Sequence, residues 1–281
     1  MLPAVFQYQF MQFAILAGIC GGVTCAITGV FVVTMHLSFI GVCIAHAAFA
    51  GALLSMLIGI NPLIGALFFS VASAVAIGPM ADRGELNPDT SIGIVFSLML
   101  GLSFLFLGLM PGSRTEALNL FWGSILTVSR QDLAFLIIIT IVLIVLVAAF
   151  YKEIQAVICH RAVAMAVGIS ATLIFYSLLI LTGLTVTASM RSIGGLLVYS
   201  LIVNPAAAAY QLTYNLRRMF VIASVFGVTS CMAGLASSYF FNLPSGAAIV
   251  ITSSIIFGIS MIFSPKRKTK KKQQSRIPHQ I

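Results

Sequence analysis

Charged side chains are scarce in this sequence, and acidic ones are the scarcest. Of 281 residues, 7% are charged and 6 are Asp or Glu, whereas 60% are hydrophobic and the mean hydropathy is +1.12. A water-soluble domain usually has about 25% charged residues. The composition therefore excludes a soluble globular protein, and the apolar surface must face lipid instead.

Sequence patterns typical of enzymes are also missing. The chain has no His-Glu-x-x-His, no Gly-x-Ser-x-Gly and no Gly-x-x-x-x-Gly-Lys-Ser/Thr phosphate loop. We therefore expect no catalytic residue and no permanently bound cofactor, so that ATP, if it drives the protein, binds to a partner subunit. No Asp or Glu lies in the interior of an expected membrane span, since Asp132 is only the second residue of its span, and this disfavours a proton-driven pump.

The cysteines form no motif. None of the five belongs to a Cys-x-x-Cys pair, and four lie in apolar runs, where Cys behaves as a small hydrophobic residue. They are Cys20, Cys25, Cys43, Cys159 and Cys231. No disulfide framework is indicated.

The net charge of +9 is concentrated at the carboxyl end. The basic residues there are Lys266, Arg267, Lys268, Lys270, Lys271, Lys272 and Arg276. Positive charge beside a membrane span marks the cytoplasmic side and attracts anionic lipid headgroups, so it does not indicate a nucleic-acid partner here. We expect a transmembrane domain over 1–264 and a disordered, basic cytoplasmic tail over 265–281.

Long apolar runs follow one another along the rest of the chain. They predict an all-α, polytopic helical membrane protein with about eight or nine transmembrane helices. The expected spans are 10–34, 39–60, 62–80, 91–110, 131–151, 166–187, 190–213, 218–240 and 244–263. Counting backwards from a cytoplasmic tail places the amino end outside and the joints at 81–90 and 151–165 inside.

One histidine interrupts the apolar pattern. His46 is the only histidine deep within an expected span, where an imidazole faces a cavity, an ion path or a hydrogen-bond partner. Cys43 precedes it by one helical turn, and an imidazole with a thiol suits a soft or borderline divalent metal. Because two ligands cannot close a site, the pair predicts a transient transport contact. A structural histidine and a packed cysteine remain the alternatives.

Two further features suggest function. Asn204-Pro205 interrupts the seventh expected span, and broken helices often line transport sites, although neighbouring helices also stabilise simple kinks. The joint at 151–167 has helical propensity and mixed charge, including Lys152 and Glu153. It is either a short surface helix that docks a partner or a solvated connector.

Several segments together resemble the permeases of ABC-type zinc, manganese and iron importers. Residues 193–209 are similar to the family's Val-Gly-x-Leu-Leu-Val-x-Ala-Leu-Leu-Ile-x-Pro-Ala-Ala-Thr-Ala stretch. Residues 89–94 resemble its Asp-Thr-x-Ile-Gly-Ile, residues 122–126 with 132–133 its Phe-Gly-x-Ile-Leu…Asp-Leu, and residues 151–156 its Phe-Lys-Glu-Leu-x-Ala. The resemblance covers most of the chain.

This resemblance implies a non-enzymatic, multi-pass permease subunit of a binding-protein-dependent importer in the plasma or inner membrane. Its cargo would be a divalent transition metal (zinc, manganese or iron) or a metal chelate. The implied partners are a second permease copy in a homodimer around a central path, two cytoplasmic ABC ATPase subunits and an extracytoplasmic substrate-binding protein. The ATPase would engage Lys152, Glu153, His160 and Arg161.

The chain departs from the family pattern at two places. The family's Gly-Asp-x-Leu-Ser-His-Ala motif keeps its histidine as His46, but Val42 replaces the aspartate. Loss of that hard oxygen ligand favours either a softer ion with Cys43 as ligand or a chelated cargo. His160-Arg161-Ala162 also replaces the family's Asp-Pro-Glu, so the matching ATPase surface should differ.

The residues disfavour two rival functions without eliminating them. An ATP-independent channel or secondary carrier for a small cation would use His46 as a titrating group. A membrane metalloenzyme would need at least three protein ligands on the metal. A neighbouring gene for an ATPase and a binding protein would separate the importer from both.

Overall fold

The fold is known from a computed structural model, which describes residues 8–82, 87–111, 115, 117–118 and 125–266. Within these ranges every regular element is a helix. The elements are α2 (Gln9–Thr34), α3 (Ile40–Leu57), α4 (Pro62–Asp82), α5 (Pro88–Leu109), the short 3₁₀ helix η1 (Ile125–Thr127), α7 (Arg130–Ala149), α8 (Tyr151–Cys159), α9 (Arg161–Ala166), α10 (Ala171–Ile193), α11 (Gly195–Leu212), α12 (Leu216–Phe241) and α13 (Ser245–Ile262).

The membrane spans agree with the sequence prediction. Eight of these helices are long and apolar enough to cross a bilayer, and α11 contributes a shorter apolar stretch, Leu197–Leu212. Each of the nine expected ranges thus coincides mainly with one of these nine helices. The all-α, polytopic fold is confirmed. The expected motif at 122–124 and most of the basic tail lie outside the described residues.

The joint between α10 and α11 was predicted wrongly. The spans expected at 166–187 and 190–213 place a break before Arg191, but α10 continues to Ile193. Hydroxyl groups near the end of α10 donate to carbonyls one turn earlier, as Thr187 Oγ1 does to Gly183 O at 3.0 Å. Because these polar side chains are satisfied within the helix, the helix does not have to end at them. The chain turns at Gly194, whose φ of +94° suits glycine alone.

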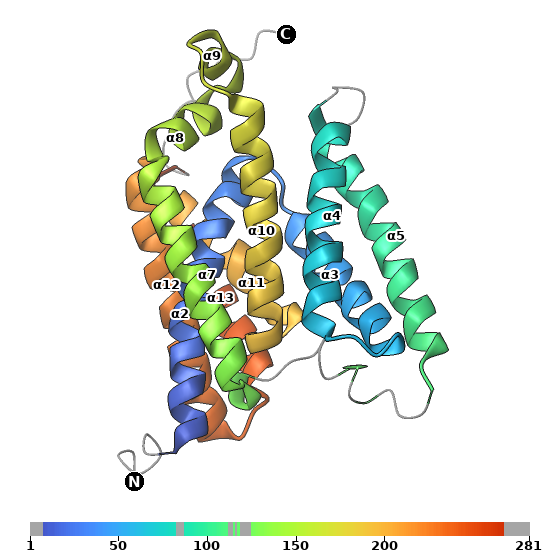
Figure 1. Cartoon of the computed structure of the whole chain (residues 1–281). Helices are drawn as coiled ribbons and strands as arrows, with labels where there is room; N and C mark the ends of the chain where they lie inside the picture. The colour runs from blue at the N-terminus through green and yellow to red at the C-terminus, as the bar shows by residue number, and fades with distance from the viewer. Residues whose placement is uncertain (1–7, 83–86, 112–114, 116, 119–124, 267–281) are drawn as a thin grey trace, which may run out of the picture.

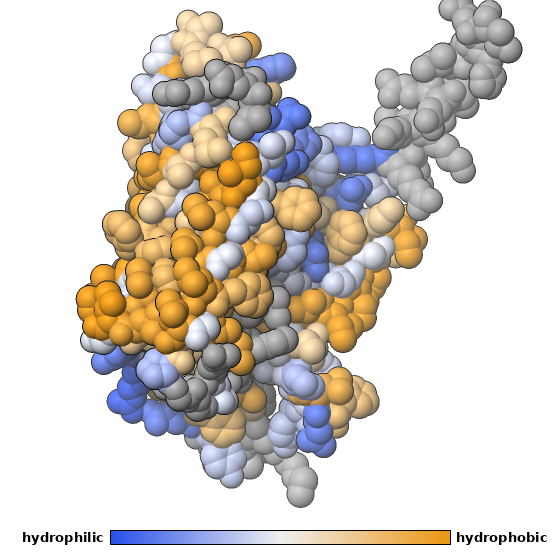
Figure 2. Space-filling model, turned by 90° about the vertical axis from the view of Figure 1, so that its right-hand side faces the viewer, coloured by the Kyte–Doolittle hydropathy of each residue, from blue (hydrophilic) through white to orange (hydrophobic). Residues whose placement is uncertain are grey.

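The helices form a bundle with two distinct ends (Figure 1). The short helices α8 and α9 lie at the end opposite the start of α2. The α11–α12 joint shares the end of α8, because the Tyr151 ring lies 6.5 Å from the Phe220 ring. A broad band of hydrophobic residues covers one side of the bundle between more hydrophilic ends (Figure 2), as expected for a surface that faces lipid.

Helices α2 and α3 lie at the centre of the packing. α2 contacts α7, α10, α11 and α12, whereas α5 packs mainly on α3 and α4. Small residues permit the closest crossings. A Cβ atom on Gly22 would lie 2.8 Å from the Gly227 carbonyl carbon, and a Cβ on Gly51 would overlap the Gly65 carbonyl oxygen. The second contact brings α4 close to α3, which carries the histidine.

Candidate functional site

His46 is held by its own helix. Its Nδ1 lies 2.9 Å from the carbonyl oxygen of Val42, one turn earlier in α3. A carbonyl only accepts hydrogen bonds, so this contact places the ring proton on Nδ1 and leaves Nε2 as the nitrogen with the lone pair in the neutral imidazole. Histidines that bind metals are commonly oriented by such a bond to a backbone carbonyl.

Neighbouring α5 also packs against the histidine. The Phe96 ring meets the imidazole edge to face, with 5.1 Å between the ring centroids. Ser103 Oγ, about two helical turns further along α5, donates to the carbonyl oxygen of His46 at 3.2 Å. His46 and Val42 are both half-buried. They therefore mark the accessible side of this part of α3, and Val42 lies where the resembling family has its aspartate.

Cys43 lies in a different environment from His46. Its side chain is fully enclosed in the main hydrophobic core. Among the residues that the structure describes, no group of three or more His, Cys, Asp or Glu side chains is placed to hold a metal ion. The structure therefore gives Cys43 the surroundings of a packed cysteine and brings no third such ligand to His46.

Asn204 takes part in a polar cluster between α11 and α13. Its Nδ2 donates to Ser253 Oγ at 2.9 Å and to the Oγ atoms of Ser200 and Ser254 at 3.1 Å each. Ser200 and Ser253 are themselves 2.8 Å apart. α11 continues through Pro205, so the expected interruption is not a break in the helix. The cluster satisfies the amide nitrogen within the membrane.

A half-open groove of about 950 Å³ runs beside this cluster. It is lined by Tyr199, Ser200 and Asn204 of α11 and by residues of the α12–α13 joint such as Pro244. The Tyr199 ring also packs on α3, because a Cβ atom on Gly41 would lie 3.4 Å from Tyr199 Cδ2. Tyr199 thus connects the groove with the helix that carries His46.

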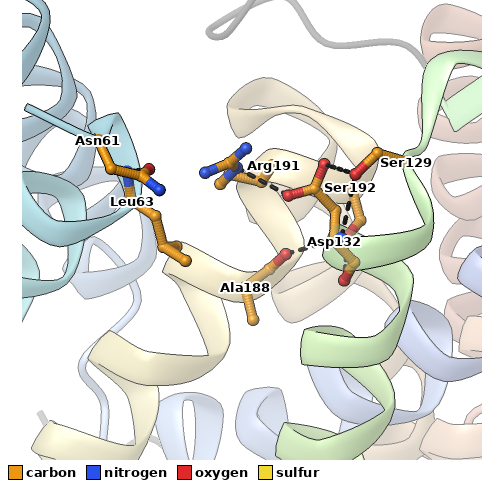
Figure 3. Close-up of polar contacts among 7 residues, drawn as sticks. All are labelled: Asn61, Leu63, Ser129, Asp132, Ala188, Arg191 and Ser192. Carbon is orange, nitrogen blue, oxygen red and sulfur yellow. Dashed lines mark hydrogen bonds and ion pairs between the residues drawn. The ribbon is translucent and has the colours of Figure 1, made fainter.

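An ion pair at the opposite end from α8 was missed by sequence reasoning. Arg191 Nε, near the end of α10, lies 2.9 Å from Asp132 Oδ1 at the start of α7 (Figure 3). Ser129 Oγ donates to the other carboxylate oxygen at 2.6 Å and accepts from the Asp132 backbone N–H at 3.1 Å. The Ser-x-x-Asp spacing is a helix-start signal that could have identified half of this network.

The segment that resembles the family's coupling region forms α8 and α9. Ile154 and Val157 are buried, whereas Lys152 is exposed and Glu153 half-buried. His160 is exposed and separates the two helices. The expected short surface helix is therefore present at 151–159, and its charged side is accessible.

Arg161 is attached to the bundle instead of extending into solvent. Its Nη2 donates to Thr172 Oγ1 at 3.2 Å, and its guanidinium lies 5.0 Å from the centroid of the Phe175 ring. These contacts fix α9 to the start of α10. Apolar side chains nevertheless remain exposed around α9, namely Val163, Met165 and Val167.

The first residue of the basic tail is also anchored. Lys266 Nζ lies 3.5 Å from the centroid of the Tyr210 ring and 4.5 Å from that of Tyr214. Partial burial between these rings lowers the pKa of Lys266 from its usual value. Ser264 Oγ donates to the Gln211 carbonyl at 3.0 Å. The tail therefore starts at the α11–α12 joint, at the end of the bundle that carries α8.

Comparisons with known proteins agree on one class of membrane transport protein. The sequence profile of the ABC 3 transport family matches residues 7–264. The manganese transport system membrane protein MntC of Listeria monocytogenes is 36% identical over 266 residues, which cover 95% of each chain. The manganese import system permease protein ScaB of Streptococcus gordonii is 30% identical over 272 residues, covering 97% of this chain and 98% of the relative.

A solved structure has the same architecture. It is that of PsaBC from Streptococcus pneumoniae in complex with Fab, which matches with a TM-score of 0.85 and 29% identity. The match covers 97% of this chain and 98% of that one.

Proposed function

The chain belongs to the ABC 3 transport family and is a multi-pass, membrane-spanning permease subunit of a metal ABC importer, and we propose that its cargo is manganese(II). The manganese assignment comes from relatives that match the chain almost from end to end. The chain provides the conduit for the ion, and ATP hydrolysis takes place on separate ATPase subunits.

The orientation of His46 is the observation that best supports a metal path. Its Nδ1 is occupied by the Val42 carbonyl, so the neutral ring presents Nε2 as the metal-binding nitrogen. A single imidazole binds a divalent ion weakly. Weak binding suits a transport station, which must release its ion as readily as it takes it up. Asn204 and Pro205 belong to the same proposed path.

The surroundings of Cys43 favour manganese over a softer ion. A thiolate ligand would select metals such as zinc, whereas manganese prefers oxygen and tolerates imidazole. Cys43 is fully enclosed, and Val42 occupies the accessible position one turn before His46. We therefore assign the transient metal contact to His46 and treat Cys43 as part of the core.

The α8–α9 segment is the proposed docking surface for the ATPase. It combines exposed charge at Lys152 and His160 with exposed apolar side chains at Val163 and Val167, and Glu153 lies beside Lys152. Arg161 supports this surface by fixing α9 to α10. In this arrangement the end with α8, α9 and the basic tail is cytoplasmic, and the end with Asp132 and Arg191 faces outward.

The remaining parts of the importer follow from the family. Two permease copies enclose the path, and an extracytoplasmic substrate-binding protein delivers the ion to the outward end. The basic tail lies at the cytoplasmic surface, where anionic lipid headgroups attract it.

Transport by the reconstituted complex tests this proposal. The permease is co-purified with its ATPase, inserted into vesicles and supplied with radioactive manganese and the binding protein. We expect ATP-dependent uptake that excess unlabelled manganese abolishes and that equal concentrations of zinc or iron(II) reduce far less. Uptake that zinc suppresses as well as manganese does would contradict the assignment of the cargo.

A further inference from the structure

The serines around Asn204 fix the direction of its side-chain amide. The hydroxyls of Ser253 and Ser254 donate to the carbonyl oxygen of Val250 at 2.8 and 2.9 Å. Their oxygens are then available to accept from Asn204 Nδ2, as the Ser200 oxygen does. The amide NH₂ is therefore turned toward three hydroxyls, and its oxygen Oδ1 is directed away from them.

The groove beside Asn204 has no fixed charge. Its lining contains no Lys, Arg, His, Asp or Glu among the residues that the structure describes. Within the described ranges, no N–H or O–H group donates a hydrogen bond to Asn204 Oδ1, and the hydrogen bonds of this side chain are made by its amide nitrogen. Asn204 lines the groove, and its Oδ1 is the negative end of the oriented amide dipole. An amide oxygen without a donor can act as a ligand for a cation.

The depth of this cluster argues against simple contact with lipid. Asn204 lies near the middle of α11, and Ser253 and Ser254 lie near the middle of α13. Asn204 is half-buried and Ser254 is exposed. Polar groups that face hydrocarbon at this depth are unfavourable and are usually turned toward a path or a cavity. We therefore expect the cluster to face a path or a cavity instead of lipid.

We propose that Asn204 Oδ1 is a neutral oxygen ligand for the transported divalent cation as it passes through the groove. Ser200, Ser253 and Ser254 are positioning residues that hold the amide in this direction, and water completes the coordination. Manganese accepts carbonyl and water oxygens, so this station supplies the hard ligand that Val42 does not. The inference rests on the proposed function and names a second contact for the same cargo.

A neutral ligand also has a kinetic advantage at this point. A carboxylate at mid-membrane would bind a divalent ion strongly where the local dielectric constant is low. An amide oxygen attracts the ion without a full opposite charge. The station is therefore expected to bind briefly and release fast.

Manganese binding and uptake by the vesicle-embedded complex test this station, with Mn²⁺ alone as the probe. Bound Mn²⁺ is measured by electron paramagnetic resonance, and uptake gives KM and the maximal rate. Asn204→Leu keeps the side-chain volume but removes the ligand, and we expect KM to rise on the order of tenfold. The double change Ser253→Ala with Ser254→Ala frees the amide and should raise KM in the same direction by a smaller factor.

Asn204→Asp gives the opposite result if the station is real. Added charge should strengthen Mn²⁺ binding and lower the maximal rate, because release becomes slow. Ser97→Ala is the matched control, since Ser97 is an exposed serine on α5 that bonds only its own helix at 2.9 Å. It should leave KM and the maximal rate unchanged.

The outcomes distinguish a failure of the proposed Asn204 contact from a failure of the proposed function. The Asn204 station would be rejected if all three Asn204 and serine variants kept the wild-type KM and Mn²⁺ binding together with ATP-dependent uptake. The proposed function would remain valid in that case. Absence of ATP-dependent manganese uptake in the wild-type complex would reject the proposed function first. If Asn204→Leu fails to assemble, the Asp and double-serine variants decide between these outcomes.

Discussion

On α3, His46 is oriented by a carbonyl of its own helix, whereas on α11 Asn204 is oriented by hydroxyls from two helices. The first arrangement depends on one bond of 2.9 Å to Val42. The second depends on three bonds of 2.9 to 3.1 Å. A side chain within a membrane can therefore be oriented by its own helix or by packing against a second helix. Only the first arrangement involves residues that are all close together in the sequence.

The same contrast separates the helices themselves. The apolar windows of α2 and α3 are 72% buried within the protein, whereas that of α5 is 17% buried, although all three are strongly hydrophobic. Glycines such as Gly22 and Gly51 allow α2 and α3 to be surrounded by other helices. Hydrophobicity thus identifies a span but does not indicate how deeply that span is buried.

The largest expected effect comes from removing the locally oriented ligand. His46→Ala should reduce manganese uptake by the reconstituted complex to background, because no other described His, Cys, Asp or Glu cluster can replace it. Cys43→Ala is the matched control and should retain most uptake, since its side chain is enclosed in the core. Equal losses in the two variants would contradict the distinction between these neighbours. Size-exclusion chromatography confirms that both complexes assemble.

The next largest effect is expected at α8, which belongs to the proposed docking surface for the ATPase. Reversing two charges with Lys152→Glu and Glu153→Lys should abolish most substrate-stimulated ATP hydrolysis while leaving Mn²⁺ binding unchanged, because these residues lie far from the path. Gln155→Ala, on the exposed side of the same helix, serves as the control. Normal stimulated hydrolysis in the charge-reversed complex would remove α8 from the docking surface.

Introducing the carboxylate that the resembling family has at position 42 should have an intermediate effect. Val42→Asp places an acidic oxygen one turn before His46 on the accessible side of α3, where it can share the ion with the imidazole. We expect Mn²⁺ affinity to rise by on the order of tenfold, or about 1.4 kcal/mol, in an equilibrium titration followed by electron paramagnetic resonance. Unchanged affinity would show that this side of α3 does not face the ion.

The smallest effect is expected at the end of the bundle that carries Asp132 and Arg191. Asp132→Asn removes the charge that faces Arg191, and the pair is only partly buried, with side-chain exposures of 15% and 29%. We expect a loss of stability of about 0.5–1 kcal/mol, measured by thermal unfolding in detergent. Arg130→Gln, a charge removal at the exposed start of α7, is the control and should change stability less.

The sequence predicted the spans because hydrophobic length alone defines them. It did not predict that α10 extends past Arg191, since its hydroxyl groups resemble a polar joint until their bonds to the helix carbonyls are seen. His46 and Asn204 stood out as polar exceptions in apolar runs. Their surroundings could not be predicted, because Ser253 lies 49 residues from Asn204 in the chain and uniformly apolar helices give no sign of which neighbours they meet.

Manganese uptake by vesicles containing the permease alone, compared with vesicles containing the permease and its ATPase, tests the central claim most directly. We predict no uptake by the permease alone with or without a membrane potential, and uptake by the complex only when ATP is supplied. Sustained manganese uptake by the isolated permease would contradict a role as an ATP-dependent conduit and would instead make the chain a self-sufficient channel or carrier.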